Sequence, residues 1–143
     1  MEKDTNSVLQ MLDLFFSSIS FKQKKEKTGE LKLSINHSID RQKNNNDDSL
    51  FRVIITTTIE DDQKQLQLKV ETVGIFKIMD TTLDDETKQT LISLNTVAIM
   101  FPYIRSEIAI LTAQPGIVPI QIPIVDVNKL VRDWNNFQQK PTD

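Results

Sequence analysis

Apolar and polar residues alternate along several stretches in the first half of the chain, a pattern typical of half-buried β-strands. The first stretch covers residues 8–21, and its alternation slips by one at Ser17 and Ser18, which indicates a bulge within a long strand. The second covers residues 31–36. Residues 40–49, with three consecutive asparagines, follow it, and we expect them to form a flexible loop.

The next two stretches predict a β-hairpin. Residues 51–60 are rich in β-branched side chains, and Asp61 and Asp62 supply turn chemistry directly after them. Leucine and valine then alternate with polar residues from Leu66 to Val70, so a fourth strand begins at once.

The pattern changes to a helical spacing after residue 80. Thr82 or Asp84 can cap the helix, and acidic residues follow in its first turn, where they interact favourably with the helix dipole. The apolar positions recur every three or four residues at Leu91, Leu94, Ala98, Phe101, Ile104, Ile108 and Leu111. Pro102 predicts a kink and not a break, because the stripe continues in phase beyond it.

The helix also carries apolar residues off this stripe, at Ile92, Val97, Ile99, Met100 and Ile110. A helix that is apolar nearly all round is buried on both sides, and in so small a domain the second side meets another subunit. We therefore expect an oligomer interface that includes Leu91, Leu94, Ala98, Phe101 and Ile108.

After Pro115 and Gly116 end the helix, residues 116–125 form an aliphatic segment interrupted by two prolines. Asp126 then caps a short second helix. The proline-bearing crossover has two interpretations: it walls a groove that accepts an extended peptide, or it is a loop that covers the core. On the first, the candidate peptide-binding residues are Phe51, Ile117, Val118, Ile120, Ile122, Leu130 and Trp134.

Four strands followed by two helices predict an α+β fold, and 143 residues suit one domain over 1–143. We expect residues 1–7 and 138–143 to be disordered. The absence of cysteine excludes thiol catalysis and thiolate metal sites. With Glu2 and Asp4 at the start and no run of about 18 apolar residues, we expect a cytoplasmic protein without a membrane span.

The charged residues do not suggest nucleic acid as a partner, because the net charge is −3 and the densest basic cluster, 22–27, lacks aromatic residues. His37, the only histidine, could act as a general base, but we place it on the polar side of its strand as a surface residue. Asp61 and Asp62 are better explained by the turn, and Asp84 by the cap. We expect no enzyme activity, no cofactor and no metal.

Several local motifs, in their order along the chain, resemble the SecB family of bacterial export chaperones. They are Ile19-Ser20-Phe21 in the first strand, Gly74-Ile75-Phe76-Lys77-Ile78 in the fourth, Ile99-Met100-Phe101-Pro102-Tyr103-Ile104-Arg105 in the long helix, Pro115-Gly116-Ile117-Val118-Pro119 in the crossover and Asn128-Lys129-Leu130 in the short helix. Together they span about residues 8–135.

The resemblance implies a twisted four-stranded antiparallel sheet with one long kinked helix and a short C-terminal helix. It also implies a dimer of dimers that holds unfolded or precursor proteins without ATP. A second hypothesis is a dedicated chaperone or scaffold for a single partner, such as an antitoxin, with no connection to export.

One part of the family pattern differs here. The family docks its export motor ATPase on carboxylates beside the first-strand motif and on the fourth strand. The matching positions are Ser18, Lys22 and Lys69, together with Gln67, where the family has an aliphatic residue, and none of the four is acidic. A motor that docks by charge complementarity should therefore bind this surface poorly.

Overall fold

The computed structural model describes residues 8–26, 29–123 and 126–132. It divides into two compact units, 1–79 with the strands and 80–143 with the helices, and each is described by itself. The expected disorder at residues 1–7 and 138–143 lies outside the described residues.

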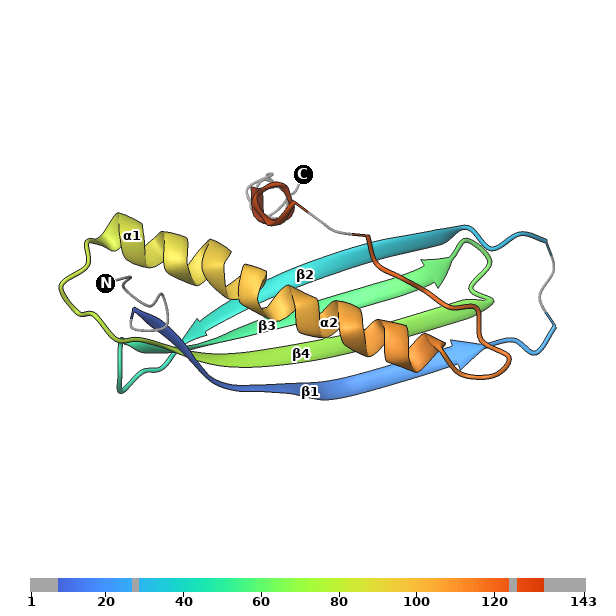
Figure 1. Ribbon diagram of the computed structural model, residues 1–143, viewed down its shortest axis with the longest axis horizontal. Helices are drawn as coiled ribbons and strands as arrows, with labels where there is room; N and C mark the ends of the chain where they lie inside the picture. Colours follow the sequence, from blue (N-terminus) through green and yellow to red (C-terminus); the bar gives the residue numbers. More distant parts are fainter. Residues whose placement is uncertain (1–7, 27–28, 124–125, 133–143) are drawn as a thin grey trace, which may run out of the picture. The chain divides into compact units, whose positions relative to one another are not determined.

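The first unit is one antiparallel sheet of four strands in the order β1-β4-β3-β2 (Figure 1). The strands are β1 (Leu9–Gln23), β2 (Leu33–Lys43), β3 (Leu50–Asp61) and β4 (Leu66–Ile78). The sheet and the long helix that follows it confirm the predicted α+β fold. The prediction of a loop over residues 40–49 is wrong for its first four residues, because β2 stays paired with β3 as far as Lys43.

Strand β1 contains two irregularities in its pairing with β4. One lies between Phe16 and Ser18, as the slip in the sequence pattern predicts, and the other lies between Met11 and Asp13. Each extra residue shifts the alternation of side chains by one, and the two shifts together bring most apolar positions of β1 onto one face of the sheet: Leu9, Met11, Leu14, Phe16, Ile19 and Phe21.

The buried face of the sheet is set by the register of the two central strands. Its side chains come from alternate positions: Phe51, Val53, Ile55, Thr57 and Ile59 of β3, and Leu66, Leu68, Val70, Thr72, Phe76 and Ile78 of β4. Val53, Ile55 and Ile59 are fully buried. The opposite face carries mainly polar and charged side chains, so the sheet is two-sided in the manner of antiparallel sheets.

The predicted hairpin turn is present between β3 and β4. The Asp61 carboxylate accepts a hydrogen bond from the backbone N–H of Leu66 at 2.9 Å and another from the side chain of Gln65 at 3.2 Å. Burial alone would raise the pKa of Asp61, but these hydrogen bonds stabilise its charged form and lower the pKa below its usual value. Asp61 is therefore a turn residue, as its place in the sequence suggests.

The second unit begins with a long helix that consists of α1 (Asp85–Thr90), a π-helical turn η2 (Leu91–Asn95) and α2 (Thr96–Thr112) (Figure 1). Asp84 caps it, because its carboxylate accepts a hydrogen bond from the backbone N–H of Thr87 at 2.8 Å. The helix runs through Pro102 without a break, as predicted. Residues 127–132 are also helical, and the Asp126 carboxylate accepts a hydrogen bond from the N–H of Asn128.

The buried side of the long helix differs from the predicted stripe. Its positions recur every four residues at Ile92, Thr96, Met100, Ile104, Ile108 and Thr112, with Val97 and Phe101 beside them. Ala98 is exposed, and Leu91, Leu94 and Leu111 are half-buried. The π-helical turn provides the physical reason at the N-terminal end, since its extra residue rotates the preceding positions relative to α2.

His37 lies on the opposite face of β2 from the one predicted. Because side chains alternate with a period of two, His37 shares a face with Ile35 and Ile39 and is half-buried. Its Nδ1 lies 2.9 Å from the hydroxyl oxygen of Thr57, its partner on β3. The prediction of a surface histidine is therefore wrong.

We expect the burial of His37 to make the protein less stable in mild acid. Burial lowers the pKa of His37 from 6.5 to about 4, so the unfolded chain takes up a proton that the folded chain does not. The free energy of unfolding should therefore fall as the pH drops below about 6.5, by about 2 kcal/mol at about pH 4.5. Urea unfolding of the wild type and of His37→Asn at pH 7 and at about pH 4.5 measures this loss.

His37→Asn provides the matched control, because its side chain keeps hydrogen-bonding atoms near Thr57 and does not titrate. Carboxylates contribute equally to the acid response of both proteins, so the difference between the two losses belongs to His37. Equal losses of stability in the two proteins would contradict the prediction.

Candidate peptide-binding site

The crossover begins with a tight turn after α2. Gly116 has a φ angle of +81°, in the left-handed region that favours glycine, and the N–H of Ile117 donates to the carbonyl of Gln114 at 3.1 Å. The turn reverses the chain, so the crossover returns along α2 (Figure 1).

Two side chains of α2 hold the crossover in an extended form. The buried Thr112 hydroxyl accepts a hydrogen bond from the N–H of Ile120 at 2.9 Å, and Arg105 Nε donates to the carbonyl of Ile122 at 3.0 Å. The two contacts lie about two helical turns apart on α2, so they fix the direction and the register of the crossover. The side chains of Ile120 and Ile122 are buried as a result, whereas Gln121 is exposed.

An open groove of about 550 Å³ runs between α2 and the returning crossover. Its lining is aliphatic and prolyl, with three polar side chains: Pro102, Arg105, Ser106, Ala109, Gln121, Ile122 and Pro123. A groove with mainly apolar walls and a few polar groups is the usual form of a site for an apolar ligand or peptide. The sequence motif around Pro102 contains two of these residues, but no local pattern assigns them to a groove.

The predicted peptide-binding residues of the crossover differ in their exposure. Val118 is 42% exposed and Ile117 is half-buried, so both side chains are accessible to a peptide. Ile120 and Ile122 are buried by the chain itself, and Ile122 alone of the four lines the groove. Leu130 is half-buried in the short helix.

Phe51 and Trp134, the other two predicted residues, do not add to this groove. Phe51 lies in β3 with only 3% of its surface exposed, and its ring stacks on Phe76 at a centroid distance of 5.8 Å. The register pairs Phe51 with Phe76 on the buried face, so it is a core residue in the single chain. Trp134 lies outside the described residues. The assignment of these seven side chains to a peptide site stays a prediction.

The second apolar stripe of α2 is exposed. Ile99, Tyr103 and Ile110 recur at spacings of four and seven residues and are 36%, 49% and 61% exposed. Of the predicted interface residues, Phe101 and Ile108 are buried within the single chain, while Ala98 is exposed. A surface on α2 for another copy would therefore be centred on the exposed stripe.

The apolar character of the long helix exceeds what the single chain buries. From Asp85 to Thr112 it has the length and composition of a membrane span, a test that core helices of soluble proteins also pass. Only 33% of its most apolar stretch is buried. Uncovered apolar surface of this kind usually marks an interaction site.

The described residues contain no group of three or more His, Asp or Glu side chains that could hold a metal ion. Three features define the class of protein: a four-stranded antiparallel sheet, a long helix with an exposed apolar stripe, and a crossover that borders a groove. The chain matches the model of the family described as preprotein translocase subunit SecB over residues 2–139. It therefore belongs to the SecB family, and the resemblance inferred from the sequence motifs is confirmed.

One solved structure agrees with this assignment at the level of the fold. The chain is similar to Rv1957, a SecB-like chaperone of Mycobacterium tuberculosis solved in complex with a ChAD peptide from the HigA1 antitoxin. The TM-score is 0.67 at 16% identity, covering 83% of this chain and 88% of that one. A Streptococcus agalactiae protein of unknown function gives a TM-score of 0.46 at 5% identity, covering 81% and 97%. No match was found among curated proteins.

Proposed function

We propose that this chain is an ATP-independent chaperone that assembles as a homo-oligomer and holds non-native polypeptide against apolar surface. The observation that carries the proposal is the exposure of large apolar side chains at several separate places in the described residues. These include Phe15 and Ile19 on β1, Ile99, Tyr103 and Ile110 on α2, and Val118 on the crossover.

The groove between α2 and the crossover supports holding in particular. Apolar contacts are non-directional and contribute about 25 cal/mol per Å² of buried surface, so one groove can accept many sequences. The hydrogen bonds of Thr112 and Arg105 keep its wall extended before a client arrives. Such preorganisation reduces the ordering cost of binding. No nucleotide is needed for this activity, and we propose no catalytic step.

A second candidate function is a dedicated chaperone for a single partner such as an antitoxin. It is favoured by the fold match, since the Mycobacterium tuberculosis relative was solved with an antitoxin peptide. The register of the sheet also supports it. The register places Ser18, Lys22, Gln67 and Lys69 on the polar face of β1 and β4, so these four docking positions present two lysine charges and no carboxylate. We infer that docking of an export motor ATPase there is weak.

The test of holding is suppression of aggregation of a chemically denatured protein upon dilution, without ATP. We expect the wild type to suppress light scattering at a stoichiometric ratio, and Val118→Asp to lose most of that effect. A charged carboxylate in the apolar contact must be desolvated without a partner, which is costly. Gln114→Asp is the matched control, because it adds the same charge to an exposed position directly before the crossover that does not line the groove.

The outcomes separate the two candidate functions. Suppression of several unrelated denatured proteins supports general holding. Tight binding of one partner, without general suppression, supports a dedicated chaperone. If the wild type neither suppresses aggregation nor binds non-native chains, both are rejected.

A further inference from the structure

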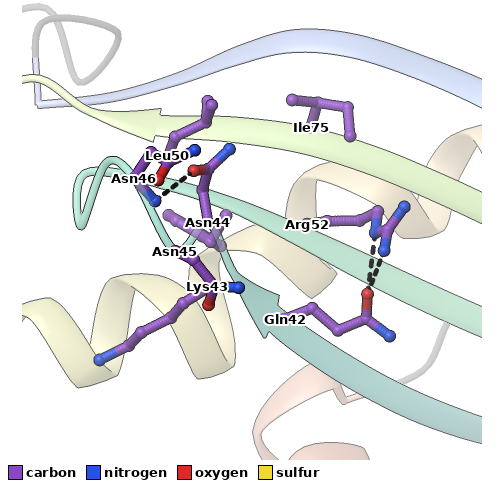
Figure 2. A pocket seen from close by; sticks show the side chains of 9 residues that line it. Gln42, Lys43, Asn44, Asn45, Asn46, Leu50, Arg52 and Ile75 are labelled. Carbon is purple, nitrogen blue, oxygen red and sulfur yellow. Dashed lines mark hydrogen bonds between the residues drawn. The ribbon is translucent and has the colours of Figure 1, made fainter.

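A second pocket, formed by other residues, lies in the sheet at the β2–β3 hairpin and has a volume of about 440 Å³ (Figure 2). Gln42, Arg52 and Ile75 stand side by side on the polar face, because the register pairs Gln42 with Arg52 and Arg52 with Ile75. The hairpin asparagines, Asn44, Asn45 and Asn46, and Leu50 complete the lining together with Lys43 and Phe51. None of the lining residues is acidic.

The guanidinium of Arg52 is held in place by a relay of hydrogen bonds. Arg52 Nε donates to the side-chain carbonyl of Gln42 at 3.0 Å, and Nη2 of Arg52 donates to the same oxygen. The amide nitrogen of Gln42 in turn donates to the Asp40 carboxylate at 2.9 Å. Arg52 is thus oriented through a neutral amide, and no hydrogen bond of its Nη1 occurs in the described part of the chain.

The other charged groups near the pocket do not neutralise Arg52 directly. Asp13 lies on the far side of Ile75 in the same row of the sheet, and its carboxylate accepts from the N–H of Leu14. Asp47 accepts from Ser49 and is close enough to Lys77 for that charge to contribute to lowering its pKa. In Figure 2 the side chain of Lys43 runs away from Arg52. Arg52 is therefore the cation that this pocket presents.

We propose that this pocket binds an acidic side chain of an extended peptide, with the carboxylate on Arg52. The fork of a guanidinium matches the two oxygens of a carboxylate. Ile75 and Leu50 offer an apolar surface for the methylene groups of the acidic side chain and for an apolar side chain next to it in the peptide. The side-chain amides of the asparagines can both donate hydrogen bonds to a peptide backbone and accept them from it. This inference rests on the proposed function: the site would make the chaperone prefer client segments in which an acidic residue stands next to apolar residues.

The geometry favours an acidic side chain over a chain terminus. Sites for a terminal carboxylate commonly use converging free backbone N–H groups. Here the N–H of Asn44 donates to the carbonyl of Leu50, that of Asn46 to the side chain of Asn44, and that of Leu50 to the carbonyl of Asp47. All three are occupied, so these N–H groups do not converge on a terminal carboxylate.

A titration followed by NMR tests the site directly. The probe is a short peptide, blocked at both ends, with one glutamate between valines, added to the ¹⁵N-labelled full chain. We expect shifts at Arg52 Nε and at the side-chain amides of Gln42 and Asn44. Replacing the glutamate by glutamine should weaken binding about fivefold, the scale of a solvent-accessible ion pair of good geometry.

Two variants complete the test. Arg52→Gln should weaken binding of the glutamate peptide about fivefold, whereas Lys69→Gln, which removes a like charge elsewhere on the same face, should leave it unchanged. Equal binding of the two peptides overturns the proposal, as does an unaffected Arg52→Gln variant. Preference for a glutamine peptide with a free carboxyl terminus also overturns it. Aggregation suppression is measured in a separate assay, so a negative peptide titration rejects the acidic-residue site without rejecting the proposed holding function.

Discussion

Replacing Tyr103 and Ile110 together by aspartate is expected to convert the proposed homo-oligomer into a monomer of 16.4 kDa. Both side chains belong to the exposed stripe of α2. Burial of each is worth about 1.5 kcal/mol or more, and a symmetric interface counts each substitution twice. The free energy of association should therefore weaken by at least about 6 kcal/mol, which lowers the association constant by more than about 10,000-fold. Light scattering after size exclusion at micromolar concentration measures the mass.

Ala113→Asp is the control for this experiment. Ala113 directly follows α2 and is exposed, so the variant adds a charge close to the helix without interrupting the stripe. We expect the control to keep the mass of the wild type. A wild type that is already a monomer, or a double variant that keeps the oligomeric mass, would refute the assignment of this stripe to an interface.

Truncating Ile55 to alanine is expected to destabilise the protein by about 2–4 kcal/mol, a large part of the stability of an ordinary domain. Ile55 is fully buried in a central strand, where it is paired with Ile39 of β2 and Thr72 of β4. Removal of its side chain leaves a cavity among neighbours on both sides. Urea unfolding measures the free energy of unfolding, and the slope of this free energy against urea concentration should stay unchanged.

The matched control for Ile55 is its neighbour on the other face of the sheet. Thr56 points to the polar face and is half-buried, so Thr56→Ala should lower the free energy of unfolding by less than about 1 kcal/mol. Similar losses for the two variants would mean that the two faces of β3 do not differ as the register indicates.

Much of the fold follows from local patterns in the sequence. The alternation in β3 and β4 predicts the hairpin, and Asp61 acts in the turn where the sequence places it. The slip at Ser17 predicts one bulge of β1, and Asp84 predicts the helix start. These features depend on interactions within a few residues or on a period that the chain itself carries, so they can be inferred without knowledge of distant neighbours.

The candidate site was less predictable, because burial depends on which distant segments meet. Ile120 and Ile122 look as available as Val118 in the sequence, but the contacts of Thr112 and Arg105 turn them toward the chain's own interior. The role of Phe51 was hidden for a similar reason, since only the pairing of β3 with β4 places it against Phe76.

The sequence alone determined the order and type of the elements, the family motifs and the excess of apolar residues, because periodicity, capping and composition are properties of the chain itself. The tertiary structure decided which of those apolar residues stay exposed. It placed His37 among buried side chains, rotated the covered side of the long helix and fixed Arg52 in a pocket. Each of these outcomes depends on strand register or on contacts between segments far apart along the chain, which no local pattern specifies.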